Sequence, residues 1–417
     1  MDVFNQVSPF IGAPAWNQNI LLVLNLASAI GLLVFSRKSQ WKSNVPARGL
    51  LVIQLFWLWS FFAFIRGIGN AHNYWDWKVL LLSYLPSVAI SLAVVLGVNY
   101  QYSAKLLRFI LFKLFPISFL FIPFALAYAD EFYSRLVMPA CLFVLISPYL
   151  QKKWRILVVA VALTSIAMDI SYRANVLRLL IPLMLVVLFY FRPVLQSKLM
   201  NWFLAALLCT PLILLTLGVT GTFNVFAENK MDLEVSTTLE GETGSSNISA
   251  DTRTLLYVEI FNSMQKRGSS FLLGEGGAAG YETDLFVDAV LNEKGRYSSE
   301  VGFLNTLLYS GAIGVLIYAL VLFVPAYYAI NKSNNRLCKM IGLFLAARWV
   351  LSFVEDIAQF DMNFFFLWFM IGLCLSNRFR SMTDVQLAQY FGASRSVKLP
   401  VIRKNTRLVG GLNKVRR

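Results

Sequence analysis

Apolar runs long enough to cross a lipid bilayer recur along most of this chain. A helix of about 20 apolar residues spans the hydrocarbon core of a membrane. Of the 417 residues 58% are hydrophobic and 14% are charged, whereas a soluble domain carries roughly 25% charged residues. The sequence therefore predicts an all-α fold, a polytopic transmembrane bundle. We place about eleven membrane helices at residues 20–36, 49–65, 79–98, 107–128, 135–150, 155–171, 176–191, 201–219, 302–330, 339–354 and 362–376.

These helices divide the chain into four parts. Residues 1–219 form an eight-helix membrane region, and residues 220–300 form one large loop outside the membrane. Residues 301–376 add three membrane helices, and residues 377–417 form a basic tail. The first apolar run follows a Lys-free, acidic start without a small-residue cleavage site, so we expect a retained helix and no removed signal peptide.

Positive charge is distributed unevenly between alternate loops. The chain has 37 Lys and Arg residues against 22 Asp and Glu residues, and one set of loops, with the tail, holds most of the basic ones. Basic loops stay in the cytoplasm, which predicts an outer N-terminus and a cytoplasmic C-terminus, with the tail near anionic lipid. The excess charge therefore does not indicate a nucleic-acid partner. The basic residues on this side are Arg37, Lys38, Lys42, Arg48, Lys105, Arg108, Lys152, Lys153, Arg155, Arg192, Lys198, Lys332, Arg336, Lys339, Arg378, Arg380, Arg395, Lys398, Arg403, Lys404, Arg407, Lys414, Arg416 and Arg417.

Cysteine and histidine provide no metal or disulfide chemistry in this pattern. The cysteines are Cys141, Cys209, Cys338 and Cys374, all in or beside predicted helices, so no disulfide framework is indicated. The single histidine, His72, excludes a His-rich metal centre. We therefore expect neither a metal site nor a cofactor.

The large loop contains one amphipathic segment. Asp251 is a suitable N-cap, Leu256, Ile260 and Met264 repeat every fourth residue, and Gly268 ends the pattern, so residues 251–268 predict a short helix. The preceding Ser/Thr/Gly/Glu-rich residues 235–250 predict a flexible stretch, and the Gly-rich residues 271–280 predict irregular structure. The loop is either a lid over the bundle or a plain connection.

Arginines at the outer edge of the bundle are the main candidates for a site. Asp169, Arg173 and Arg178 flank the junction of the sixth and seventh predicted helices, and Arg253 lies in the first turn of the amphipathic helix. The helix dipole disfavours a cation at that position unless an anion binds it. Guanidinium groups bind phosphate through paired hydrogen bonds, so a lipid-linked pyrophosphate is a natural ligand. The alternative for Arg173 and Arg178 is an interfacial role beside Asp169 or a lipid phosphate.

Arg348 is the one arginine inside a predicted membrane helix near acidic residues. Glu355, Asp356 and Asp361 lie at the outer end of that helix, about two turns away. A charge in this position is costly and marks a functional or an ion-paired residue. Both interpretations stay open: a phosphate contact, or a structural ion pair.

Three stretches resemble motifs of the O-antigen ligase and Wzy-type polymerase superfamily. The likeness covers roughly residues 155 to 325, and it depends on the order of the motifs and the placement of the long loop. The stretches are Ser171-Tyr-Arg-Ala-Asn-Val-Leu177; Asp251-Thr-Arg-Thr-Leu-Leu-Tyr257 with Phe271-Leu-Leu-Gly-Glu-Gly276; and Ser298-Ser-Glu-Val-Gly-Phe-Leu304 with Tyr309-Ser-Gly-Ala-Ile-Gly314.

The resemblance implies a GT-C-like, metal-independent glycosyltransferase in the bacterial inner membrane, with the large loop in the periplasm. The enzyme would polymerise oligosaccharide repeat units carried on undecaprenyl pyrophosphate, for an O-antigen, exopolysaccharide or capsule. Donor and acceptor would both be lipid-linked, and a flippase and a chain-length regulator would be partners. Arg173 and Arg253 would be catalytic and bind pyrophosphate, with Arg178 and Arg348 as further phosphate contacts.

The general base is the point where the chain departs from the ligases. Many ligases of the superfamily carry a histidine where this sequence has Glu300, which favours a polymerase with Glu300 as the base. An ordinary interfacial role is the alternative for Glu300, and likewise for His72, the other candidate base. Rival functions are an O-antigen ligase that transfers glycan to lipid A core or protein, a flippase for lipid-linked sugars, and a structural scaffold.

Overall fold

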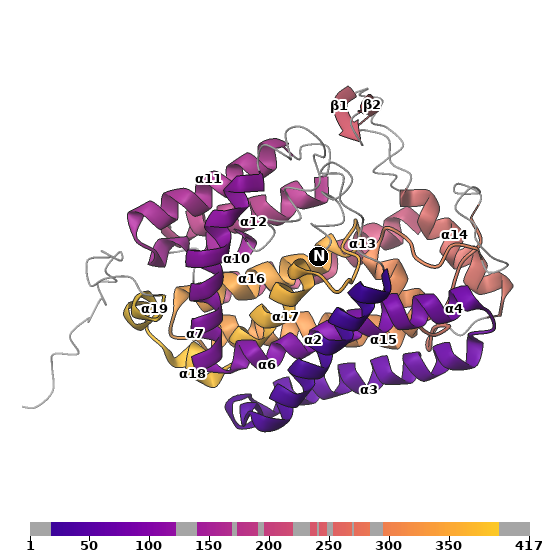
Figure 1. Cartoon of the computed structure of the whole chain (residues 1–417), viewed down its shortest axis with the longest axis horizontal. Helices are drawn as coiled ribbons and strands as arrows, with labels where there is room; N and C mark the ends of the chain where they lie inside the picture. Colours follow the sequence, from indigo (N-terminus) through magenta and orange to yellow (C-terminus); the bar gives the residue numbers. More distant parts are fainter. Residues whose placement is uncertain are drawn as a thin grey trace, which may run out of the picture.

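The structure, a computed structural model, describes residues 18–121, 140–168, 173–190, 196–219, 234–239, 242–247, 253–268, 271–283 and 295–391 (Figure 1). Within these residues the fold is all-helical apart from one short β-hairpin. Asp169, Asp251 and most of the basic tail lie outside the described residues.

Helical segments lie at the predicted positions where the structure describes the chain; the end of the predicted helix 107–128 and the start of 135–150 lie outside the described residues. Residues 74–98 form one composite segment with a π-helical turn and a 3-10 turn between its α-helical parts, and the helix after it is described as far as Phe121. The elements are α2 (Gln18–Lys38), η1 (Trp41–Asn44), α3 (Ala47–Asn70), α4 (Tyr74–Val79), η2 (Leu80–Tyr84), α5 (Leu85–Ala89), η3 (Ile90–Leu92), α6 (Ala93–Val98), α7 (Tyr100–Phe109), η4 (Ile110–Leu114), η5 (Phe115–Phe121), α10 (Ala140–Ile146), η6 (Ser147–Tyr149), α11 (Lys152–Met168), α12 (Arg173–Tyr190), α13 (Ser197–Val219), β1 (Glu234–Leu239), β2 (Glu242–Asn247), α14 (Arg253–Lys266), α15 (Gly302–Asn331), α16 (Arg336–Leu351), α17 (Met362–Leu375), α18 (Asn377–Ser381) and α19 (Asp384–Tyr390).

Four of the described segments are long and apolar enough to cross a membrane: Ala47–Asn70, Tyr74–Val98, Ser197–Leu217 and Gly302–Asn331. Shorter apolar helices occupy residues 23–37, 140–149, 174–190 and 362–375. These lengths and compositions are those of a membrane protein. The full number of crossings and the orientation of the chain stay predictions.

The predicted loops of each side meet at opposite ends of the bundle. We call the end formed by α18, α19 and the loops that contact them the basic end, and the end formed by α4, α14 and residues 271–283 the cavity end; the two are far apart in Figure 1. Hydrogen bonds join segments distant in sequence at each end. At the basic end they link Asn44 to Val98 and Ser376, Tyr149 to Asp384, and Asn334 to Arg380. At the cavity end they link Asn70 to Glu275, Tyr297 to Asp76, Phe303 to Ser352, and Tyr257 to Phe353.

Glycine allows α6 and α17 to pack closely near the basic end of the bundle. A Cβ atom on Gly97 of α6 would overlap the carbonyl oxygen of Phe369 in α17, and one on Gly372 would overlap that of Val94. Small residues let membrane helices approach until their backbones touch, because lipid supplies no hydrophobic force to drive them together. α6 and α17 therefore form a tightly packed pair.

An irregular segment enters the bundle at the cavity end and completes a broken helix. α15 is kinked at Gly311, whose φ is 67°. The backbone groups freed at this kink are taken by residues 271–276. Leu308 and Tyr309 accept hydrogen bonds from the N–H groups of Glu275 and Gly276, and Ala312 and Ile313 donate to Phe271 and Leu272. Irregular backbone in a membrane bundle needs such internal partners, and the prediction of an irregular Gly-rich segment is confirmed.

Two short strands precede α14. Within the stretch for which the sequence predicts flexibility, β1 and β2 pair as an antiparallel hairpin with Glu234 opposite Asn247. The β-branched residues Val235, Thr237 and Thr238 favour an extended backbone. The flexibility of residues 235–250 stays a prediction.

Candidate functional site

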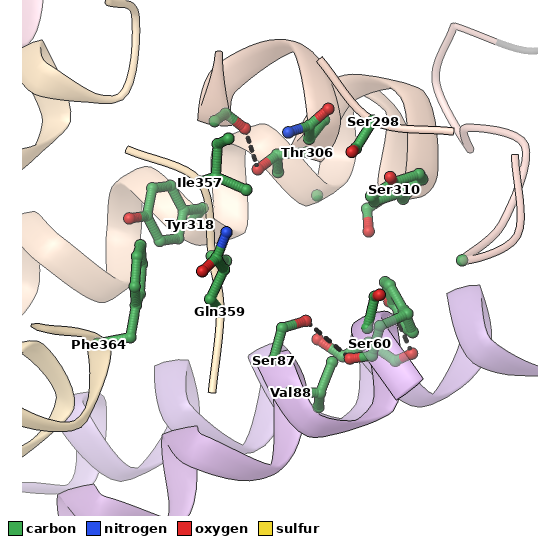
Figure 2. Close-up of a pocket in the computed structure, with 18 of the residues that line it drawn as sticks. Ser60, Ser87, Val88, Ser298, Thr306, Ser310, Tyr318, Ile357, Gln359 and Phe364 are labelled. Atoms are coloured by element: carbon green, nitrogen blue, oxygen red, sulfur yellow. Dashed lines mark hydrogen bonds between the residues drawn. The ribbon is translucent and has the colours of Figure 1, made fainter. Parts of the chain in front are cut away.

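A cavity of about 360 Å³ lies at the cavity end, between the α3 and α4–α6 segments on one side and α15 on the other. The loop between α16 and α17 closes a third side. Figure 2 shows Ser298, Thr306 and Ser310 facing Ser60 and Ser87 across the space, with Tyr318 and Gln359 at one end. The cavity therefore joins segments from both halves of the membrane region.

One face of α15 provides a regular row of small and hydroxyl side chains. Gly302, Thr306, Ser310 and Gly314 all line the cavity. A spacing of four residues keeps the first three on one face of the helix before the kink at Gly311. The composite segment opposite contributes Ser83 and Ser87, at the same spacing. The walls thus carry hydroxyl groups on otherwise apolar helices.

The lining mixes polar and apolar groups and contains no cation among the described residues. Hydroxyl and amide groups alternate with Trp59, Phe364 and Trp368, and Asp356 is the one carboxylate. Such a surface offers hydrogen-bond donors and acceptors beside aromatic faces. It suits a neutral, hydroxyl-rich ligand better than a free pyrophosphate.

Asp356 is the centre of a buried ionic cluster beside the cavity. Its carboxylate accepts hydrogen bonds from Nε of Arg348 at 3.0 Å, from Nη2 of the same guanidinium, and from Nη2 of Arg178 at 3.2 Å. Arg348 is 1% exposed and Asp356 is 2% exposed. Asn175 and Asn363 accept the outer N–H groups of Arg178 and Arg348 at 2.8 and 2.7 Å. Asp361 also interacts electrostatically with both guanidinium groups, so two acidic and two basic residues meet here.

The backbone of Asp356 is strained, with a φ of 96°. Left-handed backbone at a residue other than glycine costs of order 1–3 kcal/mol and persists only where the surroundings hold it. Here the two guanidinium groups hold the side chain, and Gly302 leaves room for the Asp356 carbonyl. The ionic cluster therefore fixes the path of the loop that forms the cavity wall.

Arg178 and Arg348 form ion pairs, and their contact with phosphate stays a prediction. Both guanidinium groups bind Asp356, so the ion-pair interpretation of Arg348 is the one observed, and Asp356 extends it to Arg178. Two turns of helix do not separate Arg348 from Asp356, because α16 ends at Leu351 and the chain then folds back toward the helix. These arginines position the wall rather than extend into the cavity.

Arg173 and Arg253 are the first residues of α12 and α14, and their side chains lie outside the described residues. Both helices nevertheless contact the same loop. α12 contacts the loop at Asp356 through Arg178. α14 contacts the loop at Phe353, whose carbonyl accepts a hydrogen bond from the hydroxyl of Tyr257 at 2.8 Å. Arg173 lies five residues before Arg178, and Arg253 lies four residues before Tyr257. At 1.5 Å per residue, each arginine backbone is therefore within about 8 Å, along its helix, of a residue that contacts this loop.

The two candidate bases lie outside the cavity lining. Glu300 is half exposed and pairs with Arg296 at 3.5 Å, but its chain neighbours Ser298 and Gly302 both line the cavity. Glu300 thus lies at the rim. His72 is exposed, and its backbone N–H donates to the buried carboxylate of Asp76 at 2.9 Å. The surrounding loop is held by Asp76, not by the imidazole.

Sequence reasoning missed the hydroxyl-rich wall and one cation. The available signal for the wall was the four-residue spacing of Thr306 with Ser310 and of Ser83 with Ser87 within apolar helices. Arg66, in the last turn of α3, has a buried Nη1 without a hydrogen-bond partner in the described part of the chain. Its backbone touches the Gly-rich segment at Gly276, so it is a further cation at the cavity end.

No group of three or more His, Cys, Asp and Glu side chains suited to a metal ion occurs in the described ranges. Comparison with known proteins gives no match to a family model, a curated protein or a solved structure. The interpretation of the site therefore depends on its geometry and chemistry.

Proposed function

We propose that the chain is a membrane-embedded glycosyltransferase of the O-antigen ligase and polymerase type. It joins oligosaccharide repeat units carried on undecaprenyl pyrophosphate into a surface polysaccharide at the outer face of the bacterial cytoplasmic membrane. In this proposal the cavity end faces the periplasm, the basic end faces the cytoplasm, and the chain crosses the membrane about eleven times in a GT-C-like bundle.

The observation that carries the proposal is the meeting of all three motif regions at one end of the bundle. α12 and α14, which begin with the two proposed pyrophosphate-binding arginines, both contact residues 353–356. Residues 271–276 bind the kink of α15, and the start of α15 lines the cavity. Segments scattered over more than a hundred residues of sequence thus line one cavity or contact the loop that forms its wall.

In this proposal the rim and the cavity bind different parts of the donor. Arg173 and Arg253 bind the donor pyrophosphate at the rim, where guanidinium groups neutralise the charge that develops as it leaves. The neutral cavity, rich in hydroxyl and amide groups, receives sugar. An acceptor hydroxyl attacks the anomeric carbon, the bond to the pyrophosphate oxygen breaks, and Glu300 at the rim takes the hydroxyl proton. A single displacement of this kind inverts the anomeric centre.

Separate Arg173→Ala and Arg253→Ala variants test the proposal in cells that lack the gene. Removal of one electrostatic contact of this type lowers the rate by about 100-fold or more, so we expect the long glycan ladder to be lost while single capped units remain. Arg37→Ala is the matched control, because Arg37 is an exposed arginine near the basic end. Protein level is followed by immunoblotting.

The gene deletion itself separates the rival functions. Loss of all attached glycan, including single units, would indicate a ligase that transfers finished glycan to lipid A core or protein. Accumulation of repeat units inside the cell would indicate a flippase and contradict both enzyme proposals. Normal ladders in both arginine variants at normal protein level would overturn the proposed site.

A further inference from the structure

A second, almost wholly apolar groove of about 360 Å³ lies beside the polar cavity. It is formed by one face of α2, the middle of α3, and α5 with η3. Ile30, Leu33 and Phe61 line it and are themselves 61%, 40% and 61% exposed, so its edges open to the outside of the bundle. Its few polar members include Ser91, which already accepts a hydrogen bond from Trp57 at 2.7 Å.

The groove is continuous with the polar cavity. Asn25, Ser60, Tyr84 and Val88 line both spaces. The three polar residues of this set lie where the two meet, and the groove then continues along α2 as far as Leu33 and along α3 as far as Trp57. From Asn25 to Leu33 the helix rises about 12 Å. The direction is away from the cavity end and toward the basic end, into the apolar depth of the bundle.

A polar chamber that opens sideways into an apolar trough fits an amphipathic ligand. We infer that the groove of α2, α3 and α5 holds the first part of the polyprenyl chain of a lipid-linked sugar whose saccharide occupies the polar cavity. This inference rests on the proposed function, and it adds which helices receive the lipid and from which side it enters. The occupant is the polyprenyl tail because it is covalently joined to the group that the cavity takes.

The groove serves to orient the lipid more than to bind it tightly. A lipid tail is already in an apolar medium in the bilayer, so its transfer to an apolar groove gains little hydrophobic free energy. What the groove fixes is the direction of the tail, and with it the position of the pyrophosphate and sugar at the cavity end. Small displacements of a reacting group lower rates strongly.

Photolabelling of the full-length protein in vesicles tests the inference directly. The probes are a polyprenyl pyrophosphate and a phosphatidylglycerol, each with a diazirine in the tail. We expect the polyprenyl probe to label residues 18–38 and 85–92, and excess unlabelled polyprenyl pyrophosphate to abolish that labelling. Labelling of the groove by both probes alike, without competition, would show that it holds bulk lipid and would overturn the inference.

Filling the groove provides a matched pair of variants. Ala29 lines the groove, whereas Ala27 lies on the opposite, exposed face of α2. We expect Ala29→Trp to lower competable labelling and chain extension by about tenfold or more, because a displaced tail misplaces the reacting end. Ala27→Trp should leave both unchanged. Equal effects of the two substitutions, or none from either, would contradict the inference.

The labelling readout keeps this inference separate from the proposed enzyme. Competable polyprenyl labelling without polymerised glycan would leave the groove assignment intact and count against polymerisation. Polymerisation without competable labelling of α2 and α5 would leave the enzyme intact and remove the groove assignment.

Discussion

The two ends of the bundle use arginine in different ways. At the basic end, most of the described guanidinium hydrogen bonds go to backbone carbonyls, as from Arg108 to Tyr390 at 2.8 Å and from Arg155 to Ser147 at 3.1 Å. The one ion pair among the residues described there, Arg336 with Asp384, is longer, at 3.7 Å. At the cavity end guanidinium groups bind carboxylates, as Arg178 and Arg348 bind Asp356. The difference follows from sequence, since the predicted cytoplasmic loops and tail contain almost no acidic residues.

The comparison indicates which end tolerates change. A guanidinium that donates to backbone carbonyls can be lost with local effects, because it leaves neutral groups and no unpaired charge behind. A guanidinium or carboxylate in a buried cluster cannot be lost alone, because its partner is then an uncompensated charge. We expect substitutions in the buried cluster at the cavity end to affect the whole fold, and loss of an arginine that binds carbonyls at the basic end to affect one element.

The largest effect should come from Asp356→Ala. It leaves Arg178 and Arg348 buried without their carboxylate, and breaking such a cluster costs about 3–5 kcal/mol. The measurement is the thermal unfolding midpoint of the purified protein in detergent, with its yield. Asp384→Ala is the control, because Asp384 pairs with Arg336 at 3.7 Å at the basic end. The side chains of this pair are less deeply buried than those of Arg348 and Asp356. A control as damaging as Asp356→Ala would break the contrast between the two ends.

The Gly-rich segment at the cavity end should be the next most sensitive feature. Gly274 has a φ of 73° and lies against the backbone of Gly311. Gly274→Ala therefore adds overpacking of about 1–3 kcal/mol to a left-handed backbone penalty of roughly 1–2 kcal/mol. Gly268 has a φ of 62° with open space around it, so Gly268→Ala carries the backbone penalty alone. Equal shifts of the unfolding midpoint would mean that residues 271–276 do not pack into the kink of α15.

At the basic end, Arg108→Ala should release α19 without unfolding the bundle. The hydrogen bonds to the carbonyls of Gln389 and Tyr390 are lost, at a net cost of about 1–3 kcal/mol. Hydrogen exchange should show faster amide exchange confined to residues 384–391. Lys105→Ala, an exposed cation one turn earlier on α7, should leave α19 protected. Faster exchange throughout the membrane helices would contradict a local role.

The smallest effect should come from an exposed ion pair at the cavity end. A hydrogen bond from Lys266, together with its charge, lowers the pKa of the Glu282 carboxyl below its usual value. A lowered folded-state pKa stabilises the protein above the unfolded-state pKa, and this contribution is lost as the pH falls through the folded-state value. The unfolding midpoints of wild type and Glu282→Gln should therefore differ slightly at neutral pH and converge in acid. Because both side chains are largely exposed, added salt should reduce the difference as well; a gap that widens in acid would contradict this assignment.

Helix positions could be predicted because each depends on a run of local sequence. α3, α13 and α15 begin and end within a few residues of the predicted spans, since length and apolar composition suffice to identify them. Gly268 follows the end of its helix, as predicted, and has a positive φ. These features need no knowledge of distant contacts.

The cavity could not be predicted in the same way. Thr306 on an apolar helix donates to the carbonyl of Gly302 at 2.9 Å, a local bond that a hydroxyl forms whether or not a cavity lies beside it. The kink at Gly311 could not be predicted from the sequence either, because glycine is common in membrane helices. Only the approach of residues 271–276 accounts for it.

The sequence by itself determined that this is a helical membrane protein, because hydrophobicity and span length are properties of each segment alone. It also determined which loops are basic and where the candidate arginines lie along the chain. The tertiary structure decided that Arg178 and Arg348 share Asp356, that residues 271–276 complete α15, and that a polar cavity continues into an apolar groove. Each of these depends on groups far apart in sequence, and only packing brings their charges, backbone hydrogen bonds and surfaces within reach of one another.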